Sequence, residues 1–147
     1  MSTTIDLRIY SKQLLQALQQ LDTLLDRVAA ADPSADELKD LASQSLAIFE
    51  ALTATREGVQ SAAKNGLEAK LDPAEARRAT ALSIAEFPLE PAIEALRAVP
   101  RLVEKANAQQ AGHAMIAVPL CLAYSHCVEA LRPLAAAVEP RDLVKER

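Results

Sequence analysis

The sequence predicts an all-α protein, an up-down-up-down four-helix bundle whose third rod is broken at Pro88–Pro91, giving five helical segments. Half of the 147 residues are apolar, yet only 3% are aromatic, and glycine occurs 3 times. Alanine, leucine and the long polar residues that fill most of the chain are strong helix formers. Apolar residues also recur at alternating spacings of three and four, which is typical of helices that bury one face.

The first helix is expected from Thr4 to Ala31. Its apolar stripe is interrupted by a single polar residue, Ser11, and otherwise keeps the spacing of a bundle or coiled-coil seam. The stripe consists of Leu7, Leu14, Leu18, Leu21, Leu25 and Val28.

The second helix is expected to begin beside Asp32-Pro33 and to reach Lys64. Asp32 or Ser34 can accept hydrogen bonds from the first free N–H groups, and Pro33 suits a first helical turn. Asn65-Gly66 is expected to stop the helix, because glycine readily supplies the left-handed residue after a last turn. Residues after Leu52 become small, so a partner helix can approach closely there.

The third rod is expected to begin at Asp72-Pro73 and to be interrupted after Glu86. The start has a capping residue, a proline and Glu75 three positions after the cap. The segment Phe87-Pro88-Leu89-Glu90-Pro91 is expected to interrupt the rod, because residues before proline avoid the α conformation. The helix should resume at Pro91, bend at Pro100 and end at Gly112.

The last helix is expected from His113 to Val138, where Glu139-Pro140 ends it. The four rods would then contain about 28, 32, 38 and 26 residues, and similar lengths with short connections favour antiparallel neighbours. Residues 1–140 are therefore expected to form one domain. The mostly charged residues 141–147 are expected to be a frayed tail.

The most unusual stretch runs from Ala106 to Val128, 23 residues without Asp, Glu, Lys or Arg. Its helix is predicted to carry two opposite apolar stripes, although a surface helix needs only one. The first contains Ala117, Leu120, Tyr124, Cys127, Leu131 and Leu134, and the second contains Met115, Pro119, Leu122, His126, Glu129 and Pro133. Either the broken third rod covers both stripes, or the second stripe binds a partner, including a second copy of the chain. The interface residues expected in the latter case are Met115, Pro119, Leu122 and His126.

A small-molecule site is the alternative use of the same helix. A proline inside a helix removes a hydrogen bond and bends the rod. A kink at Pro119 could therefore open a pocket, and cofactor-like ligands often bind between the helices of a bundle. The expected pocket residues are His113, Cys121, Tyr124 and His126.

No pattern in the sequence predicts a catalytic residue, a metal site or a cofactor. The chain has two histidines and two cysteines, and no two of these residues are three or four positions apart. The sequence also lacks Glu-x-x-His, Gly-x-Ser-x-Gly and phosphate-binding glycine loops. Cys121 and Cys127 would lie about 9 Å apart along one helix. A disulfide bond between them is therefore disfavoured, as in a reducing compartment.

The charge balance also limits the class of partner. The net charge of −4 argues against binding to nucleic acid. The N-terminus does not resemble a signal peptide, and the longest apolar run, 114–124, is shorter than a membrane span. We therefore expect a cytoplasmic, non-enzymatic protein–protein interaction module of the adaptor, chaperone or immunity type that forms a homodimer. A small-molecule-binding bundle is the alternative, and reversible attachment to an apolar surface is a third, less favoured hypothesis.

Overall fold

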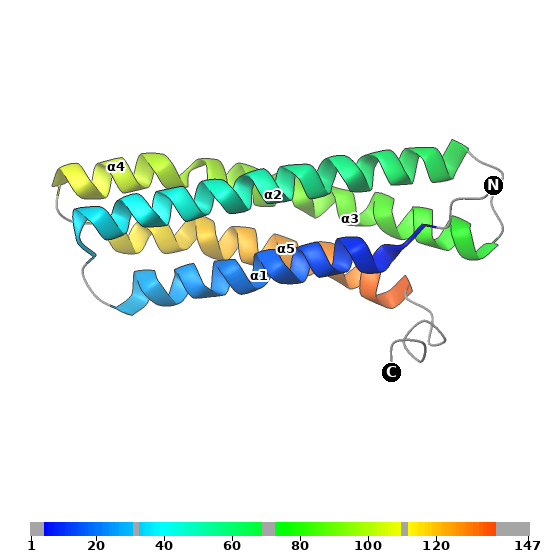
Figure 1. Cartoon of the computed structure of the whole chain (residues 1–147), viewed down its shortest axis with the longest axis horizontal. Coiled ribbons are helices and arrows are strands. Elements are labelled where there is room, and N and C mark those ends of the chain that lie inside the picture. Colours follow the sequence, from blue (N-terminus) through cyan, green and yellow to red (C-terminus); the bar gives the residue numbers. More distant parts are fainter. Residues whose placement is uncertain (1–4, 31–32, 69–72, 110–111, 138–147) are drawn as a thin grey trace.

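The computed structural model describes residues 5–30, 33–68, 73–109 and 112–137. These residues form helices that pack side by side along one long axis (Figure 1). The elements are α1 (Leu7–Ala30), α2 (Ala35–Glu68), α3 (Pro73–Arg97), α4 (Val99–Gln109), the 3-10 helix η1 (His113–Ile116) and α5 (Ala117–Ala137). Because α3 and α4 lie end to end, the described residues form four rods, and the predicted all-α bundle is confirmed.

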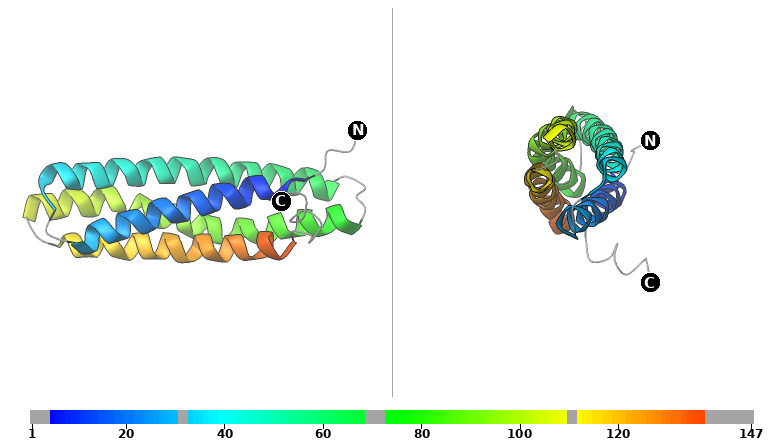
Figure 2. Two further views of the ribbon diagram at one scale, coloured as in Figure 1. Left: turned by 60° about the horizontal axis from the view of Figure 1, so that its bottom comes forward. Right: turned by 90° about the vertical axis from the view of Figure 1, so that its left-hand side faces the viewer.

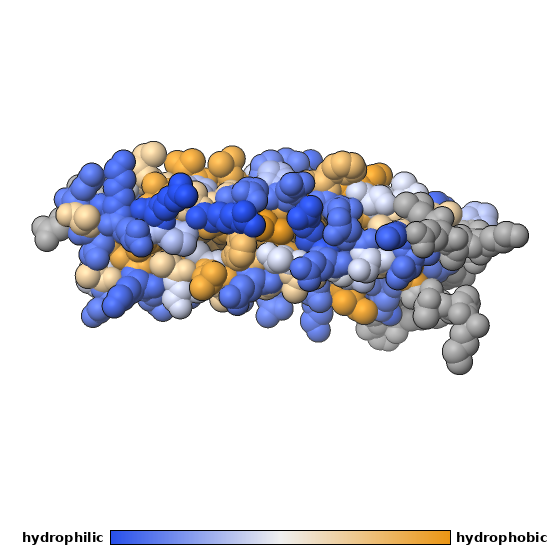
Figure 3. Space-filling view, turned by 90° about the horizontal axis from the view of Figure 1, so that it is seen from above, coloured by the Kyte–Doolittle hydropathy of each residue, from blue (hydrophilic) through white to orange (hydrophobic). Residues whose placement is uncertain are grey.

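The four rods surround a core made mostly of leucine and alanine (Figure 2). α5 packs against α3 and α1, and α2 packs against α3 and α4, whereas α1 and α2 meet over fewer residues. The largest fully buried side chains include Leu14, Leu21, Leu41, Leu52, Leu82, Leu89, Leu96 and Leu120. Hydrophilic side chains predominate on the face seen from above, with small hydrophobic islands between them (Figure 3).

Two helix starts follow the predicted local chemistry. The backbone N–H of Glu37 donates to Ser34 Oγ over 3.2 Å, and the Ser34 hydroxyl donates to Glu37 Oε1 over 3.3 Å. Ser34 therefore caps α2, with Pro33 just before the cap rather than in the first turn. α3 begins at Pro73, as predicted.

The predicted end of α2 at Asn65-Gly66 is wrong. The helix continues to Glu68, and Gly112 is the one glycine of the described ranges with a positive φ. Ala63 and Gly66 are both buried. They extend the packed face of α2 by another turn, so tertiary contacts replace the local stop signal.

The predicted interruption at Pro88–Pro91 is also wrong. α3 runs without a break through both prolines, and the helix is interrupted at Ala98, two residues before Pro100. Each proline costs α3 one hydrogen bond, but a continuous row of buried residues crosses this region and holds the backbone in place. That row contains Ala85, Leu89, Ala92, Ile93 and Leu96.

Gly112 forms a reversal between α4 and η1. Its φ of 86° is left-handed, a conformation that costs glycine little. The chain then makes one 3-10 turn before α5 begins at Ala117. The predicted helix limits Thr4, Ala31 and Val138, and the predicted tail 141–147, lie outside the described residues.

Candidate functional site: the outer face of α5 and the α1–α2 groove

The inner side of the η1–α5 segment belongs to the core of the bundle. Its buried residues recur at spacings of three and four and face α1 and α3. They include Ile116, Leu120, Ala123, Cys127, Ala130 and Leu134. This arrangement requires one buried stripe, so the opposite side of the helix remains open to solvent.

The open side carries an exposed apolar patch, which we call the α5 outer face. Met115, Val118 and Leu122 expose 57%, 52% and 49% of their surface. Three small residues lie exposed beside them, namely Ala114, Cys121 and Ser125. The α5 outer face, defined by these six residues, contains no charged side chain, which is unusual for exposed helix surface.

The structure places the four predicted interface residues on different sides of this segment. Met115 and Leu122 lie on the α5 outer face, but Pro119 is buried and His126 is partly buried. At 100° per residue within α5, Val118 and Ser125 lie about 40° to 60° to one side of Leu122 and are exposed, whereas Pro119 and His126 lie about 40° to 60° to its other side, toward the core. The predicted stripe therefore included the wrong neighbours of Leu122 and missed Val118.

The predicted kink at Pro119 is wrong. Pro119 is the third residue of α5, where a backbone N–H would have no partner within the helix. The predicted pocket residues also point in different directions. Tyr124 packs against the core and Cys121 is exposed, and at 100° per residue Tyr124 and His126 lie on nearly opposite sides of α5. His126 Nδ1 instead lies 3.7 Å from Glu129 Oε2.

The two cysteines have different environments. Cys127 is buried, and burial raises the pKa of its thiol to about 12. Cys121 is exposed on the α5 outer face, so it is the more accessible thiol toward a soluble reagent. Within the described ranges, no three His, Cys, Asp or Glu side chains lie together as a metal site would need.

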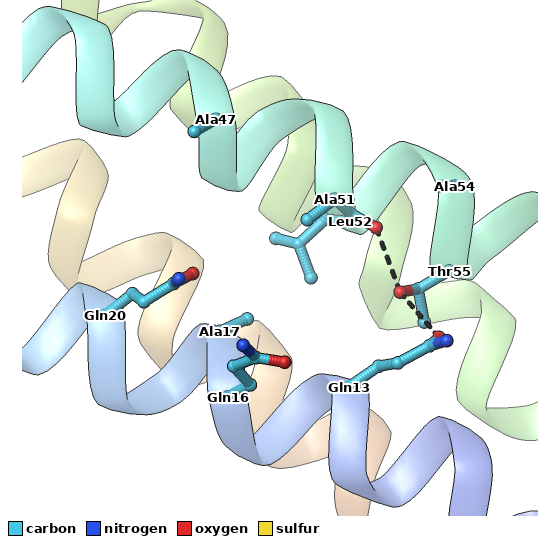
Figure 4. Close-up of a pocket in the computed structure, with 9 residues that line it drawn as sticks. All are labelled: Gln13, Gln16, Ala17, Gln20, Ala47, Ala51, Leu52, Ala54 and Thr55. Carbon is cyan, nitrogen blue, oxygen red and sulfur yellow. Dashed lines mark hydrogen bonds between the residues drawn. The ribbon is translucent and has the colours of Figure 1, made fainter.

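A groove of about 320 Å³ lies elsewhere, along the seam between α1 and α2 (Figure 4). One wall carries the amide side chains of Gln13, Gln16 and Gln20, and the other is built of small residues of α2. Thr55 bridges the seam by donating to Gln13 Oε1 over 3.0 Å. The remaining lining residues are Ala17, Ala47, Ala51, Leu52 and Ala54, so the groove is uncharged.

Two contacts hold α1 and α2 together on either side of this groove. The Tyr10 hydroxyl donates to the carbonyl of Gly58 over 3.4 Å, and Arg27 pairs with Asp40 at 2.9 Å. A Cβ atom at Gly58 would lie 3.2 Å from Tyr10 Cε1, so glycine permits this close approach. The seam is therefore closed at its ends and open in its alanine-lined middle.

Comparisons with protein-family models, curated proteins and solved structures find no match. Function must therefore be argued from the surfaces themselves. The stretch His113–Ala137 is long and apolar enough, by length and composition alone, to cross a membrane. A central helix of a bundle has the same composition, and α5 packs in this way against α1 and α3.

Proposed function

We propose that the protein is a non-enzymatic interaction module that forms a homodimer through the α5 outer face. The observation that carries this proposal is the uncharged, half-exposed patch of Met115, Val118 and Leu122. An exposed apolar patch on a helix often marks a surface that binds another protein. The free cysteines support a reducing, cytoplasmic location.

A second copy suits the α5 outer face for two reasons. A twofold contact brings the same patch against itself, and here no like charges would meet. Each chain carries a net charge of −4, so an uncharged contact adds no further repulsion between two copies. The small side chains of Ala114, Cys121 and Ser125 also allow two helices to pack closely.

Leu122→Lys is expected to convert the dimer into a monomer, because it places a charge in the centre of an apolar contact. Light scattering on a size-exclusion column should give the wild type a mass near twice the 15.8 kDa of one chain, and the variant a mass near 15.8 kDa. Leu46→Lys on α2 is the matched control, since Leu46 is also half-exposed (51%) and α2 lies across the bundle from α5. A wild-type monomer, or a dimeric Leu122→Lys variant, would refute the proposal.

Labelling of Cys121 with a maleimide gives a second readout of the same contact. In the dimer this thiol is covered, so its labelling should slow as the protein concentration rises. In the Leu122→Lys variant the rate should not depend on concentration. Cys127 should remain unlabelled in both proteins, because it is buried and its raised pKa leaves little thiolate.

A second candidate function is the binding of a small molecule. The α1–α2 groove is a better candidate for the binding site than the region of Pro119. Its volume lies at the lower end of the range for ligand sites. Amide groups on one wall and methyl groups on the other suit an uncharged ligand that has both hydrogen-bonding and apolar edges. A charged ligand would find no counter-charge among the lining residues.

The groove is tested by filling it. Ala51→Leu places a larger side chain on the alanine wall of the groove. Because Ala51 is exposed, this substitution needs no repacking of the core. A set of uncharged fragments should contain compounds that raise the melting temperature of the wild type but not of Ala51→Leu. Fragments that stabilise both proteins equally, or an absence of stabilising fragments, would exclude the groove as a ligand site.

A further inference from the structure

The outer side of α3 carries a second apolar patch, far along the chain from the α5 outer face. Phe87 is 79% exposed, the highest value among the exposed large apolar side chains of the described residues. Ile84 is half-exposed and Pro91 is exposed on the same side of the helix, at spacings of three and four. We call Ile84, Phe87 and Pro91 the α3 outer face.

The two prolines give this face an additional property. A backbone carbonyl in an α-helix normally accepts from the N–H four residues later. The residues four positions after Ile84 and Phe87 are Pro88 and Pro91, which have no N–H. The carbonyls of Ile84 and Phe87 therefore lack their usual helical donor.

The surroundings of the α3 outer face are acidic. Glu86, Glu90 and Glu94 recur every four residues, and no Lys or Arg occurs between Ala79 and Leu96. Glu90 lies 3.6 Å from Arg56, and Glu94 lies 3.3 Å from Arg97. Both glutamates are well exposed, and such surface pairs are weak, so an incoming cation can compete for them.

We propose that the α3 outer face binds a basic amphipathic helix of another protein. Phe87 and Ile84 would contact the apolar side of that helix. Its Lys or Arg side chains would donate to the two carbonyls and pair with the flanking glutamates. A second copy of this acidic chain is a poorer occupant, because the same charges that attract a basic helix repel it.

Phe87→Ser tests this proposal with a defined probe, a fluorescein-labelled 14-residue leucine–lysine peptide that forms an amphipathic helix. Fluorescence anisotropy should show about tenfold weaker binding to Phe87→Ser than to the wild type, as expected for loss of a central aromatic contact. Leu15→Ser is the matched control and should bind like the wild type. A leucine–glutamate peptide of the same length should not bind.

Pro88→Ala tests the role of the carbonyls. It restores an N–H that can bond to the Ile84 carbonyl and leaves Ile84, Phe87 and Pro91 in place, so the variant should be more stable but should bind the peptide about threefold more weakly. Pro100→Ala is the control, because Pro100 is exposed at the second position of α4, where an N–H has no helical partner.

Equal peptide affinity of wild type and Phe87→Ser would overturn the proposal, as would peptide binding that is lost in Leu122→Lys. Dimer formation by Phe87→Ser should be normal, so this test is separate from that of the α5 outer face.

Discussion

Leu89→Ala is expected to lower the free energy of unfolding by about 3 to 4 kcal/mol, as is typical of a leucine truncated in a well-packed core. Leu89 is fully buried between Pro88 and Pro91, at the point where α3 lacks two of its own hydrogen bonds. Its packing against the other rods is therefore part of what keeps these residues helical. Urea denaturation followed by circular dichroism measures the change.

Leu96→Ala is the matched control for this prediction. Leu96 is also buried on α3, but it lies beyond both prolines. Its truncation should cost a similar free energy and leave the helical signal of the folded protein unchanged, whereas Leu89→Ala should also reduce that signal. A loss below about 1 kcal/mol for Leu89→Ala would mean that the local backbone alone tolerates the prolines.

Glu75→Gln is expected to destabilise the protein by about 1 to 3 kcal/mol, because it removes the carboxylate from a nearly buried, charge-assisted contact with Arg78. Glu75 Oε1 accepts from Arg78 at 2.6 Å, and the two side chains are only 12% and 11% exposed. The other carboxylate oxygen accepts from the backbone N–H of Ile5 over 3.0 Å. One side chain therefore fixes both the first turns of α3 and the start of the described chain.

Two further variants show whether burial is the reason. Combining Glu75→Gln with Arg78→Leu should recover much of the stability that Glu75→Gln loses, because the amide oxygen can still accept from the Ile5 N–H and no cation remains beside it. Glu94→Gln is the control, since Glu94 pairs with Arg97 at the same spacing but both side chains are well exposed. That change should stay within about 0.5 kcal/mol of the wild type. Equal effects of Glu75→Gln and Glu94→Gln would contradict the interpretation.

The sequence was sufficient to predict the features that local chemistry decides. Ser34, one of the two predicted caps, caps α2, α3 begins at Pro73, and α4 ends before Gly112. The predictions failed where packing opposes a local preference. The signals at Gly66, Pro88 and Pro91 are genuine, but each lies within a continuous buried row that the local rules do not include.

The surfaces were harder to predict than the helices. The absence of charge from Ala106 to Val128 directed attention to α5, but the predicted stripe included Pro119, which is buried, and left out Val118, which is exposed. The α1–α2 groove could not be found from either helix alone. It exists because glutamines of α1 lie opposite alanines of α2, and that pairing depends on how two distant segments align.

The order of the rods has a kinetic consequence. Successive rods are neighbours in space, and the ring is closed by α1 and α5, whose sequences are the farthest apart. Contacts between successive rods form at low entropic cost, whereas joining the two ends of the chain requires closure of a long loop. Docking of α1 onto α5 is thus the step with the largest entropic barrier. It is also the step at which, in a crowded folding mixture, α1 of one chain can complete the bundle of another and produce a domain-swapped dimer.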